Sequence, residues 1–399
     1  HLSIRRQRQM CIRDRGTTGK IVGIVIDKVS REPMVGANIL VNGTNYGTAT
    51  DIEGRYFILQ IPPKTYSVTF SMIGYKDVVV KDVKIQVDLT TTLNTELEEG
   101  VIGMDAVEVT AQRPMVQADV TYSQANITSE EIDMLPVEEL EDIVALQAGV
   151  VNSGGGLHVR GGRSGEIAYM IDGVAVTDPY DAGMAVEIEN NAIQELQFIC
   201  GTFNAEYGNA MSGVVNAVTK DGNNQYSGSV NTAYSTYFTE NLRNAEKVFI
   251  GLEPFNINYN NDLKINFSGP VIKDKLYFFA NYRTQRINGH LNGIRRFEVW
   301  NLSNFYDQDS TKWISENTGD SAFVPMATGK YSSFMGKLSY NLGNIKLALM
   351  VNQNNSKSQG YNHIYKYNPD GRGYGDAKTT LTMLQLNHFI NSKMFYDLK

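Results

Sequence analysis

The amino-acid sequence predicts a mainly β protein built from three successive parts. Residues 17–98 contain short β-branched and aromatic runs separated by Gly, Pro and Asn turns, a pattern typical of an N-terminal β-sandwich. Residues 114–222 mix two short helical segments with strand-like runs, which indicates an α+β domain. Residues 223–399 alternate apolar and polar side chains between connections of alternating length, which predicts consecutive strands of one antiparallel sheet.

Composition and charge disfavour several classes of protein. The formal net charge is -7 over 399 residues, which argues against nucleic acid as the main partner, because phosphate binding needs basic patches. Two cysteines, Cys11 and Cys200, are too few for a disulfide scaffold, and we expect Cys200 to be a small buried hydrophobe. The sequence contains no run of about 18 or more apolar residues, so we expect no membrane-spanning helix.

Both ends of the sequence look unlike natural termini. Residues 1–16 carry five Arg but have no apolar segment and no small-residue cleavage site, so no signal peptide is recognised. We interpret residues 1–16 as non-native sequence. The last residues, FYDLK, fall within a strand-like run. We therefore expect a fragment, with the signal peptide and further strands missing.

The residue types present in residues 17–98 indicate a structural or interaction module. Their runs, from GIVIDKVSREPMVGANILVNG through GRYFILQIPPKTYSVTFSMIGYKD, resemble the carboxypeptidase regulatory-like domain of Bacteroidota receptors. This part contains no His, so it lacks the imidazole ligands of a zinc peptidase site. Asp51 and Glu53 before Gly54 suggest a calcium loop, but the spacing is too short for an EF-hand, and we expect a plain turn.

Residues 99–113 form a separate linking segment. Two Val alternate with Glu and Thr in MDAVEVTAQRP, which predicts a strand without an evident partner in the chain. An unpaired strand can add to the sheet edge of another protein. The segment is similar to the TonB box that precedes receptor plugs, the alternative being a plain linker strand. The candidate residues are Asp105, Ala106, Val107, Glu108, Val109, Thr110 and Ala111.

The α+β part begins with two predicted helices. Thr128 and Glu131 have the spacing of a capping box, which starts the first helix. Pro136 suits the first turn of the second helix. The apolar face of that second helix is predicted to be Leu140, Ile143, Val144 and Leu146. Strand-like runs follow at LHVRG, EIAYMIDGVAV, IQELQFIC and SGVVNAVTK.

The glycine-rich run GGGLHVRGGRSGE does not have the pattern of a phosphate-binding loop. It lacks GK[ST] and does not lead from a strand into a helix, so we interpret its glycines as positions of close packing or positive φ. VRGGRSGEIAYMIDGVAVTD and IQELQFICGTFNAEYGNAMSGVVNAVTKDG resemble the plug domain of TonB-dependent outer-membrane receptors. The resemblance implies a plug motif made of Arg160, Gly161, Gly162, Arg163, Asp172, Gly173, Glu195, Glu206, Tyr207 and Gly208.

Four charged residues of that motif carry a further hypothesis. Arg160 and Arg163, with Glu195 and Glu206, are candidates for polar contacts between the plug and the barrel wall. The alternative is that some of them are solvated surface charges.

Residues 223–399 have the pattern of outer-membrane strands. Apolar side chains on one face alternate with polar ones on the other, and we count six strands and the start of a seventh. Short turns at 269–275, 341–344 and 391–393 alternate with long connections at 239–261, 286–330 and 355–377. The resemblance implies that these are the first strands of an incomplete, roughly 22-stranded antiparallel outer-membrane β-barrel.

The function that the resemblance implies is gated uptake by a transporter. The expected location is the outer membrane of a Gram-negative bacterium of the Bacteroidota, in contact with outer-membrane lipid. The expected partner is periplasmic TonB with its inner-membrane energising complex. The ligand, peptide or oligosaccharide, stays open, as do the choice between an Oar-like and a SusC-like branch and a surface lipoprotein partner.

No enzyme, cofactor or metal is expected. The five His are scattered, and no GxSxG, HExxH or CxxC occurs, so no catalytic residue is predicted. The alternative function, from another class, is a surface adhesion or structural β-protein that binds partners without transport.

Overall fold

The computed structural model describes residues 17–44, 46–100, 107–110, 123–153, 156–201, 207, 210–237, 250–252, 255–391 and 394–399. It divides into two compact units. The first comprises residues 1–224 with 342–344 and 399, and the second comprises residues 225–341 and 345–398. Among the described residues, no helix is long and apolar enough to cross a membrane.

The N-terminal domain of the first unit is a sandwich of two sheets. One sheet consists of β1 (Gly19–Asp27), β4 (Arg55–Ile61), β7 (Thr90–Thr92) and β8 (Thr95–Leu97). The other has the order β3 (Gly47–Ala49), β2 (Asn38–Val41), β5 (Lys64–Ser71), β6 (Val78–Ile85) and β9 (Val107–Thr110). We call this sandwich the first β-domain.

Alternation of side chains along the strands produces the core of the first β-domain. Alternate residues of β1 are buried, and Ile21 and Val25 are fully inaccessible to solvent. Phe70 of the other sheet meets Tyr56 edge to face, with 5.7 Å between the ring centroids. The hydroxyl of Tyr56 donates to the carbonyl of Leu93 at 2.7 Å, and burial raises the pKa of this phenol. Both sheets therefore close over one apolar core.

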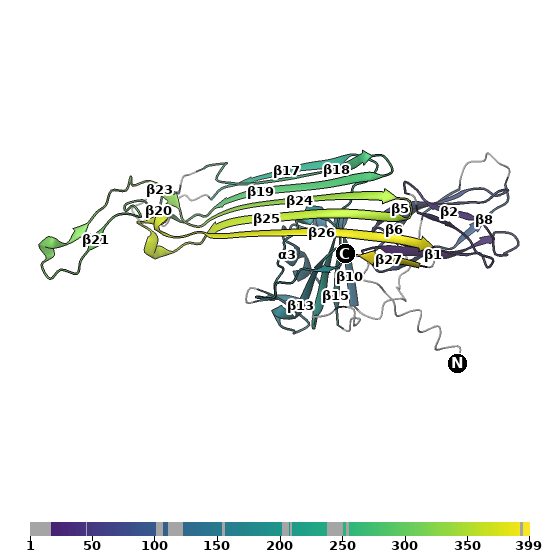
Figure 1. Ribbon diagram of the computed structural model, residues 1–399, viewed down its shortest axis with the longest axis horizontal. Coiled ribbons are helices and arrows are strands. Elements are labelled where there is room, and N and C mark those ends of the chain that lie inside the picture. Colours follow the sequence, from purple (N-terminus) through teal and green to yellow (C-terminus); the bar gives the residue numbers. More distant parts are fainter. Residues whose placement is uncertain are drawn as a thin grey trace. The chain divides into compact units, whose positions relative to one another are not determined.

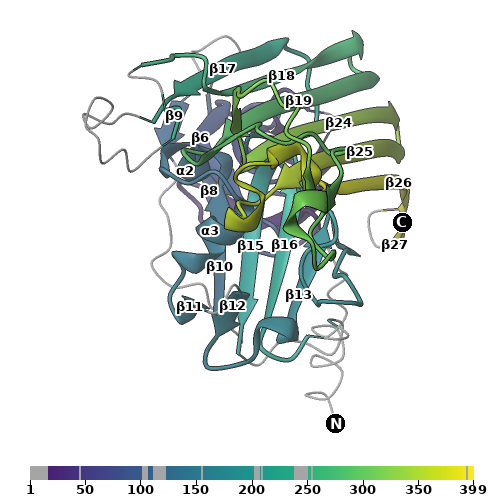
Figure 2. The ribbon, with the colours of Figure 1, turned by 90° about the vertical axis from the view of Figure 1, so that its left-hand side faces the viewer.

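The second domain of the first unit is an α+β fold around a five-stranded sheet. Its order is β10 (Ser123–Thr128), β15 (Ile193–Cys200), β16 (Gly213–Thr219), β13 (Ile167–Ile171) and β14 (Val174–Ala175), and Figure 2 shows its strands as one sheet. A separate hairpin joins β11 (Val150–Ser153) to β12 (Gly156–Val159). The helices are α2 (Ser129–Met134) and α3 (Leu140–Ala145), with one 3-10 turn at Ser164–Glu166 and another at Asn190–Ala192.

The two helices confirm part of the prediction and correct part of it. Thr128 and Glu131 form the predicted capping box at the start of α2. Pro136 does not lie in the first turn of α3, because the chain stays outside the helix until Leu140, after the acidic pair Glu138 and Glu139. Leu140, Ile143 and Val144 are buried as expected. Leu146 is 57% exposed, because the helix has already ended at the residue before it.

The second unit is dominated by one antiparallel sheet of seven strands in sequence order. The strands are β17 (Ser227–Ser235), β18 (Asn260–Ile272), β19 (Leu276–Asn288), β24 (Thr328–Leu342), β25 (Ile345–Gln359), β26 (Gly375–Asn391) and β27 (Met394–Leu398). Figure 1 shows these long strands side by side. The predicted six strands and the start of a seventh are confirmed. The strands are longer than predicted, so residues 289–327 and 360–374 remain as long connections.

The long connections carry small elements of their own. These are β20 (Asn292–Ile294) paired with β23 (Phe323–Pro325), β21 (Ser303–Asn304) paired with β22 (Ile314–Ser315), and 3-10 turns at Ser310–Lys312, His363–Tyr365 and Pro369–Gly371.

The two faces of the seven-stranded sheet differ in polarity. Leu338, Leu349 and Leu384 are between 42% and 64% exposed. On the opposite face of two of these strands, the polar side chains of Lys337 in β24 and Asn352 in β25 are buried. The predicted alternation of apolar and polar faces is therefore confirmed.

Candidate functional site

The glycine-rich loop of the plug motif is organised around Arg160. This residue has φ of 49°, and its amide donates to the carbonyl of Gly149 at 2.7 Å. Its guanidinium donates to the hydroxyl of Ser123 at 2.7 Å. A Cβ at Gly201, which has φ of 94°, would lie 2.7 Å from the same guanidinium. The positive φ therefore favours glycine at position 201, and a Cβ there would also displace the guanidinium of Arg160.

Glu166 ties the same loop to the segment before β16. Its carboxylate accepts from the amide of Arg163 at 3.0 Å. Its carbonyl accepts from the amides of Met211 and Ser212. A Cβ on Gly162 would collide with the side chains of Ser212 and Glu166, which explains the glycine at that position. Sequence reasoning missed Glu166, and only its spacing of three residues from Arg163 could have suggested a cap.

Asp172 and Gly173 form the turn between β13 and β14. Both have positive φ, 47° and 78°, as a tight hairpin of this kind requires. The Asp172 carboxylate is buried and accepts from the amide and the hydroxyl of Thr219, at 2.8 and 2.6 Å. The amide of Gly173 donates to Oδ1 of Asn216 at 3.1 Å. The Asp-Gly pair therefore fastens this hairpin to β16.

Tyr207 is another described member of the motif. It is buried in a small apolar cluster with Met170, Ile199 and Val214. Glu206 and Gly208 lie outside the described residues.

Glu195 is buried on a polar face of the five-stranded sheet of the second domain, which we call the plug sheet. Register places Thr128 opposite Glu195, Asn126 opposite Gln197, and Gln197 opposite Asn216, so these side chains share one face. Glu195 is 1% exposed, and its Oε1 accepts from the side-chain amide of Asn126. The structure thus gives this carboxyl neighbours other than the two arginines with which the sequence grouped it.

The turn after β6 of the first β-domain covers that polar face. The amide of Val87 donates to Oε1 of Glu195 at 3.0 Å. The carbonyl of Val87 accepts from Asn126 at 3.3 Å, and the carboxylate of Asp88 accepts from Gln197 at 3.1 Å. Val87 is fully buried, although it does not belong to the core cluster of its own domain. Its apolar side chain is therefore buried outside the sandwich core.

The candidate coupling segment has a partner within the chain, which corrects the expectation of an unpaired strand. The described part, β9, pairs in parallel with β6, with Val107 opposite Val78 and Thr110 opposite Lys81. Alternating apolar residues indicate a strand but cannot indicate a parallel partner so distant in sequence. Among the described strands, β9 is the last in its sheet, and Val109 is 47% exposed. Asp105, Ala106 and Ala111 lie outside the described residues.

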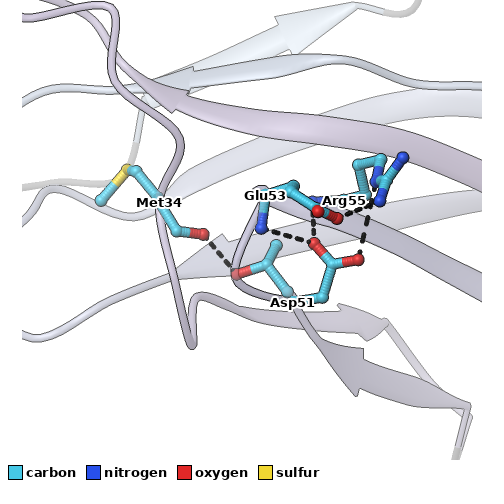
Figure 3. A network of polar contacts seen from close by, with 5 residues as sticks. Met34, Asp51, Glu53 and Arg55 are labelled. Carbon is cyan, nitrogen blue, oxygen red and sulfur yellow. Dashed lines mark hydrogen bonds and ion pairs between the residues drawn. The ribbon is translucent and has the colours of Figure 1, made fainter.

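The acidic loop at Asp51 and Glu53 is a turn held by its own chain (Figure 3). Oδ1 of Asp51 accepts from the amides of Glu53 and Arg55, at 2.9 and 2.8 Å. These bonds, led by the one from the Arg55 amide, lower the pKa of Asp51. The guanidinium of Arg55 pairs with both carboxylates. Within the described residues, no group of three or more His, Cys, Asp or Glu has a metal-binding arrangement.

The long connections of the second unit combine one ionic centre with exposed aromatics. Arg295 pairs with Asp320 at 2.9 Å and with Asp370 at 2.5 Å, so it joins two connections that lie far apart in sequence. Hydrogen bonding to Asp370 raises the pKa of Arg295. Trp300 and Tyr306 are 74% and 98% exposed. The connections therefore expose aromatic side chains, and the ion pairs of Arg295 hold two of the connections together.

Comparisons with known proteins agree with this geometry. The CarboxypepD_reg-like domain family matches residues 21–109, and the TonB-dependent Receptor Plug Domain family matches residues 116–214. The TonB-dependent transporter Oar of Myxococcus xanthus is 25% identical over 94% of this chain and 38% of its own length. The TonB-dependent receptor SusC of Bacteroides thetaiotaomicron is 28% identical over 55% of this chain and 23% of its own length.

A solved structure, the ferric enterobactin receptor of Pseudomonas aeruginosa, aligns with a TM-score of 0.43 and 15% identity over 66% of this chain and 38% of its own. The chain spans well under half the length of each of these three proteins. The named proteins are transporters and receptors, not enzymes. The chain therefore carries a CarboxypepD_reg-like domain and a TonB-dependent receptor plug domain, and over 94% of its length it is similar to a TonB-dependent transporter.

Proposed function

We propose that the protein takes up an extracellular peptide or oligosaccharide across the outer membrane of a Gram-negative bacterium, with energy from TonB. The observation that carries this proposal is the plug fold, followed along the chain by a sheet with one apolar and one polar face. A sheet of that polarity suits a wall between lipid and an aqueous lumen. The exposed aromatic side chains of the long connections can stack on sugars or peptides.

The coupling step uses β9. As the last described strand of its sheet, β9 has an outer edge at which a strand of periplasmic TonB can add while β6 stays paired on the other side. Main-chain hydrogen bonds then supply the affinity. In this proposal the first β-domain presents the coupling strand in an extended conformation, so little ordering entropy is lost on binding.

Uptake by cells with and without the gene tests this proposal. The probes are a fluorescent casein digest and a fluorescent starch oligosaccharide mixture. We expect accumulation of one of them to depend on the gene and to stop when a proton uncoupler is added. Replacing both Val107 and Val109 with Pro should also stop accumulation, because Pro has no amide hydrogen for strand pairing. Replacing both with Ile, which keeps the strand pattern, is the matched control.

The second candidate, a surface adhesion protein, is favoured by the exposed aromatics of the long connections alone. Under that function, cells without the gene would lose surface attachment while accumulation of both probes stayed unchanged. The proline variant would then attach as well as the wild type. That combination of results would contradict TonB-dependent uptake.

A further inference from the structure

The turn Gln86–Leu89 of the first β-domain forms a polar interface with the plug sheet. The turn is closed by a hydrogen bond from the amide of Leu89 to the carbonyl of Gln86, and Asp88 adopts φ of 57° within it. That conformation is one that Asp tolerates better than most residues. It leaves the amide and the carbonyl of Val87 free to bond outside the turn.

The plug supplies complementary polar groups for the amide and carbonyl of Val87 and for the carboxylate of Asp88. Glu195 receives the Val87 amide, and the side-chain amides of Asn126 and Gln124 reach the Val87 carbonyl at 3.3 and 3.5 Å. Gln197, fully buried, donates to Asp88 and accepts from Asn216. Buried polar groups are costly unless they are satisfied, so these plug residues require the turn above them.

We propose that the turn Gln86–Leu89 is a latch that holds the first β-domain on the plug, and that Glu195 makes the latch sensitive to protons, with tighter docking when its carboxyl is protonated. The inference goes beyond uptake, because it concerns two domains of the chain and requires neither a ligand nor TonB. Both described hydrogen bonds to Glu195 end on Oε1. A proton on Oε2 therefore leaves both bonds in place.

Charged residues from the neighbouring strands, the turn and α2 surround Glu195. Lys84 of β6 and Asp88 of the turn act on it in opposite senses. Lys64 and Glu130 line the crevice beside it, and Glu131 of α2 pairs with Lys84 at 3.7 Å. Desolvation is the largest influence and raises the pKa of Glu195 to about 7, while the Val87 amide, Asn126 and Lys84 lower it.

The direction of the pH dependence follows from that raised pKa. Between the ordinary value of 4.5 and about 7, the docked carboxyl keeps a proton that a solvated carboxyl has lost. Docking is therefore tightest below pH 4.5 and weakens as the pH rises through about 7. Between pH 5.5 and 8 the docking equilibrium should fall on the order of tenfold.

Hydrogen exchange at the Val87 amide tests the latch, because this amide donates to Glu195 and is released when the latch opens. The purified protein in detergent is measured at pH 5.5 and 8, with exchange corrected for the intrinsic pH dependence of each amide. In the wild type, protection of the Val87 amide should fall on the order of tenfold between the two pH values. Amides in β1, within the sandwich core, should keep their protection.

Two variants and one control decide the role of Glu195. Glu195→Gln, which keeps an acceptor without a titratable proton, should retain protection at both pH values. Glu195→Ala should lose protection of the Val87 amide at both pH values. Glu139→Gln changes an exposed plug residue that makes no side-chain cap and should respond to pH like the wild type.

An equal pH response in the wild type and Glu195→Gln would overturn the proton sensitivity. Unchanged protection in Glu195→Ala would overturn the latch. If Glu195→Ala fails to fold, the Gln variant still decides. Neither readout involves uptake, so failure here is distinguishable from failure of the proposed transport.

Discussion

The plug sheet and the seven-stranded sheet of this chain both bury polar side chains but differ in the exposure of their large apolar side chains. In the plug sheet, Phe198 and Leu196 are buried, as in a water-soluble domain. In the seven-stranded sheet, Phe334 and Leu384 are exposed, while Asn281 and Asn354 are buried. The strands of both sheets alternate with the same period, so only the medium expected on each face differs. Alternation therefore indicates a strand, whereas the exposure of its large apolar residues indicates the surrounding medium.

Removing a buried ring from the plug sheet is expected to have the largest effect on stability. Phe198→Ala should lower the free energy of unfolding by about 3–5 kcal/mol, because it leaves a cavity in a packed core. Phe334→Ala, on the exposed face of the seven-stranded sheet, should cost about 1 kcal/mol in detergent. Urea unfolding of both variants measures the difference. Equal costs would remove the contrast between the two sheets.

A charge on the exposed apolar face tests whether that face meets lipid. Leu384→Arg should reduce the stability of the membrane-inserted protein by about 2–4 kcal/mol, because a guanidinium in hydrocarbon is poorly solvated. Ile73→Arg, at a 93% exposed position of the first β-domain, should change stability by about 0.5 kcal/mol or less. The measurement is the fraction of protein inserted in outer membranes. Normal insertion of Leu384→Arg would place this face in water.

The Asp172 turn should show a smaller effect, confined to the plug. Asp172→Ala removes the bonds to Thr219 and places Ala at positive φ, at a cost of about 1–3 kcal/mol. Asp172→Asn tolerates that φ and keeps an acceptor, so it should cost less. Limited proteolysis should find faster cleavage near β14 in the Ala variant. Cleavage of the Ala variant at the wild-type rate would show that the carboxylate does not fasten the hairpin.

The capping box of α2 should make the smallest contribution. Thr128→Ala should cost about 1 kcal/mol, because the helix loses one of the two bonds of the box. Thr110→Ala, at an exposed strand position, is the control and should be close to neutral. Thermal unfolding followed by circular dichroism compares the two. A neutral Thr128→Ala would mean that packing alone fixes the start of α2.

Local patterns in the sequence predicted those helices and strands that are determined by neighbouring residues. The alternation in β18 to β26 and the Thr128 capping box were both identified from neighbouring residues, and the structure confirms them. Pro136 was misplaced because a helix can begin several residues after a proline that suits its first turn. Local patterns did not predict the contacts between residues that lie far apart in the sequence.

The contacts that sequence reasoning missed join distant residues. Glu195 bonds to Val87, which lies 108 positions earlier, and no local pattern marks that pair. The partner of β9 was missed for the same reason, since β6 is ordinary strand sequence. Glu195 was predicted to contact the barrel wall, whereas its described hydrogen bonds come from Asn126 and from the Val87 turn, and these depend on how two domains pack.

Pairing of β9 with TonB is tested by placing a photo-crosslinking residue at Val109 in cells that contain TonB. We expect a covalent adduct between this protein and TonB, which the Val107→Pro change should reduce strongly. The same crosslinker at Ile73, an exposed position away from β9, serves as the control. A TonB adduct at Ile73 with none at Val109 would contradict β9 as the coupling strand. An adduct at neither position, with uptake unaffected by loss of TonB, would contradict energy coupling through TonB altogether.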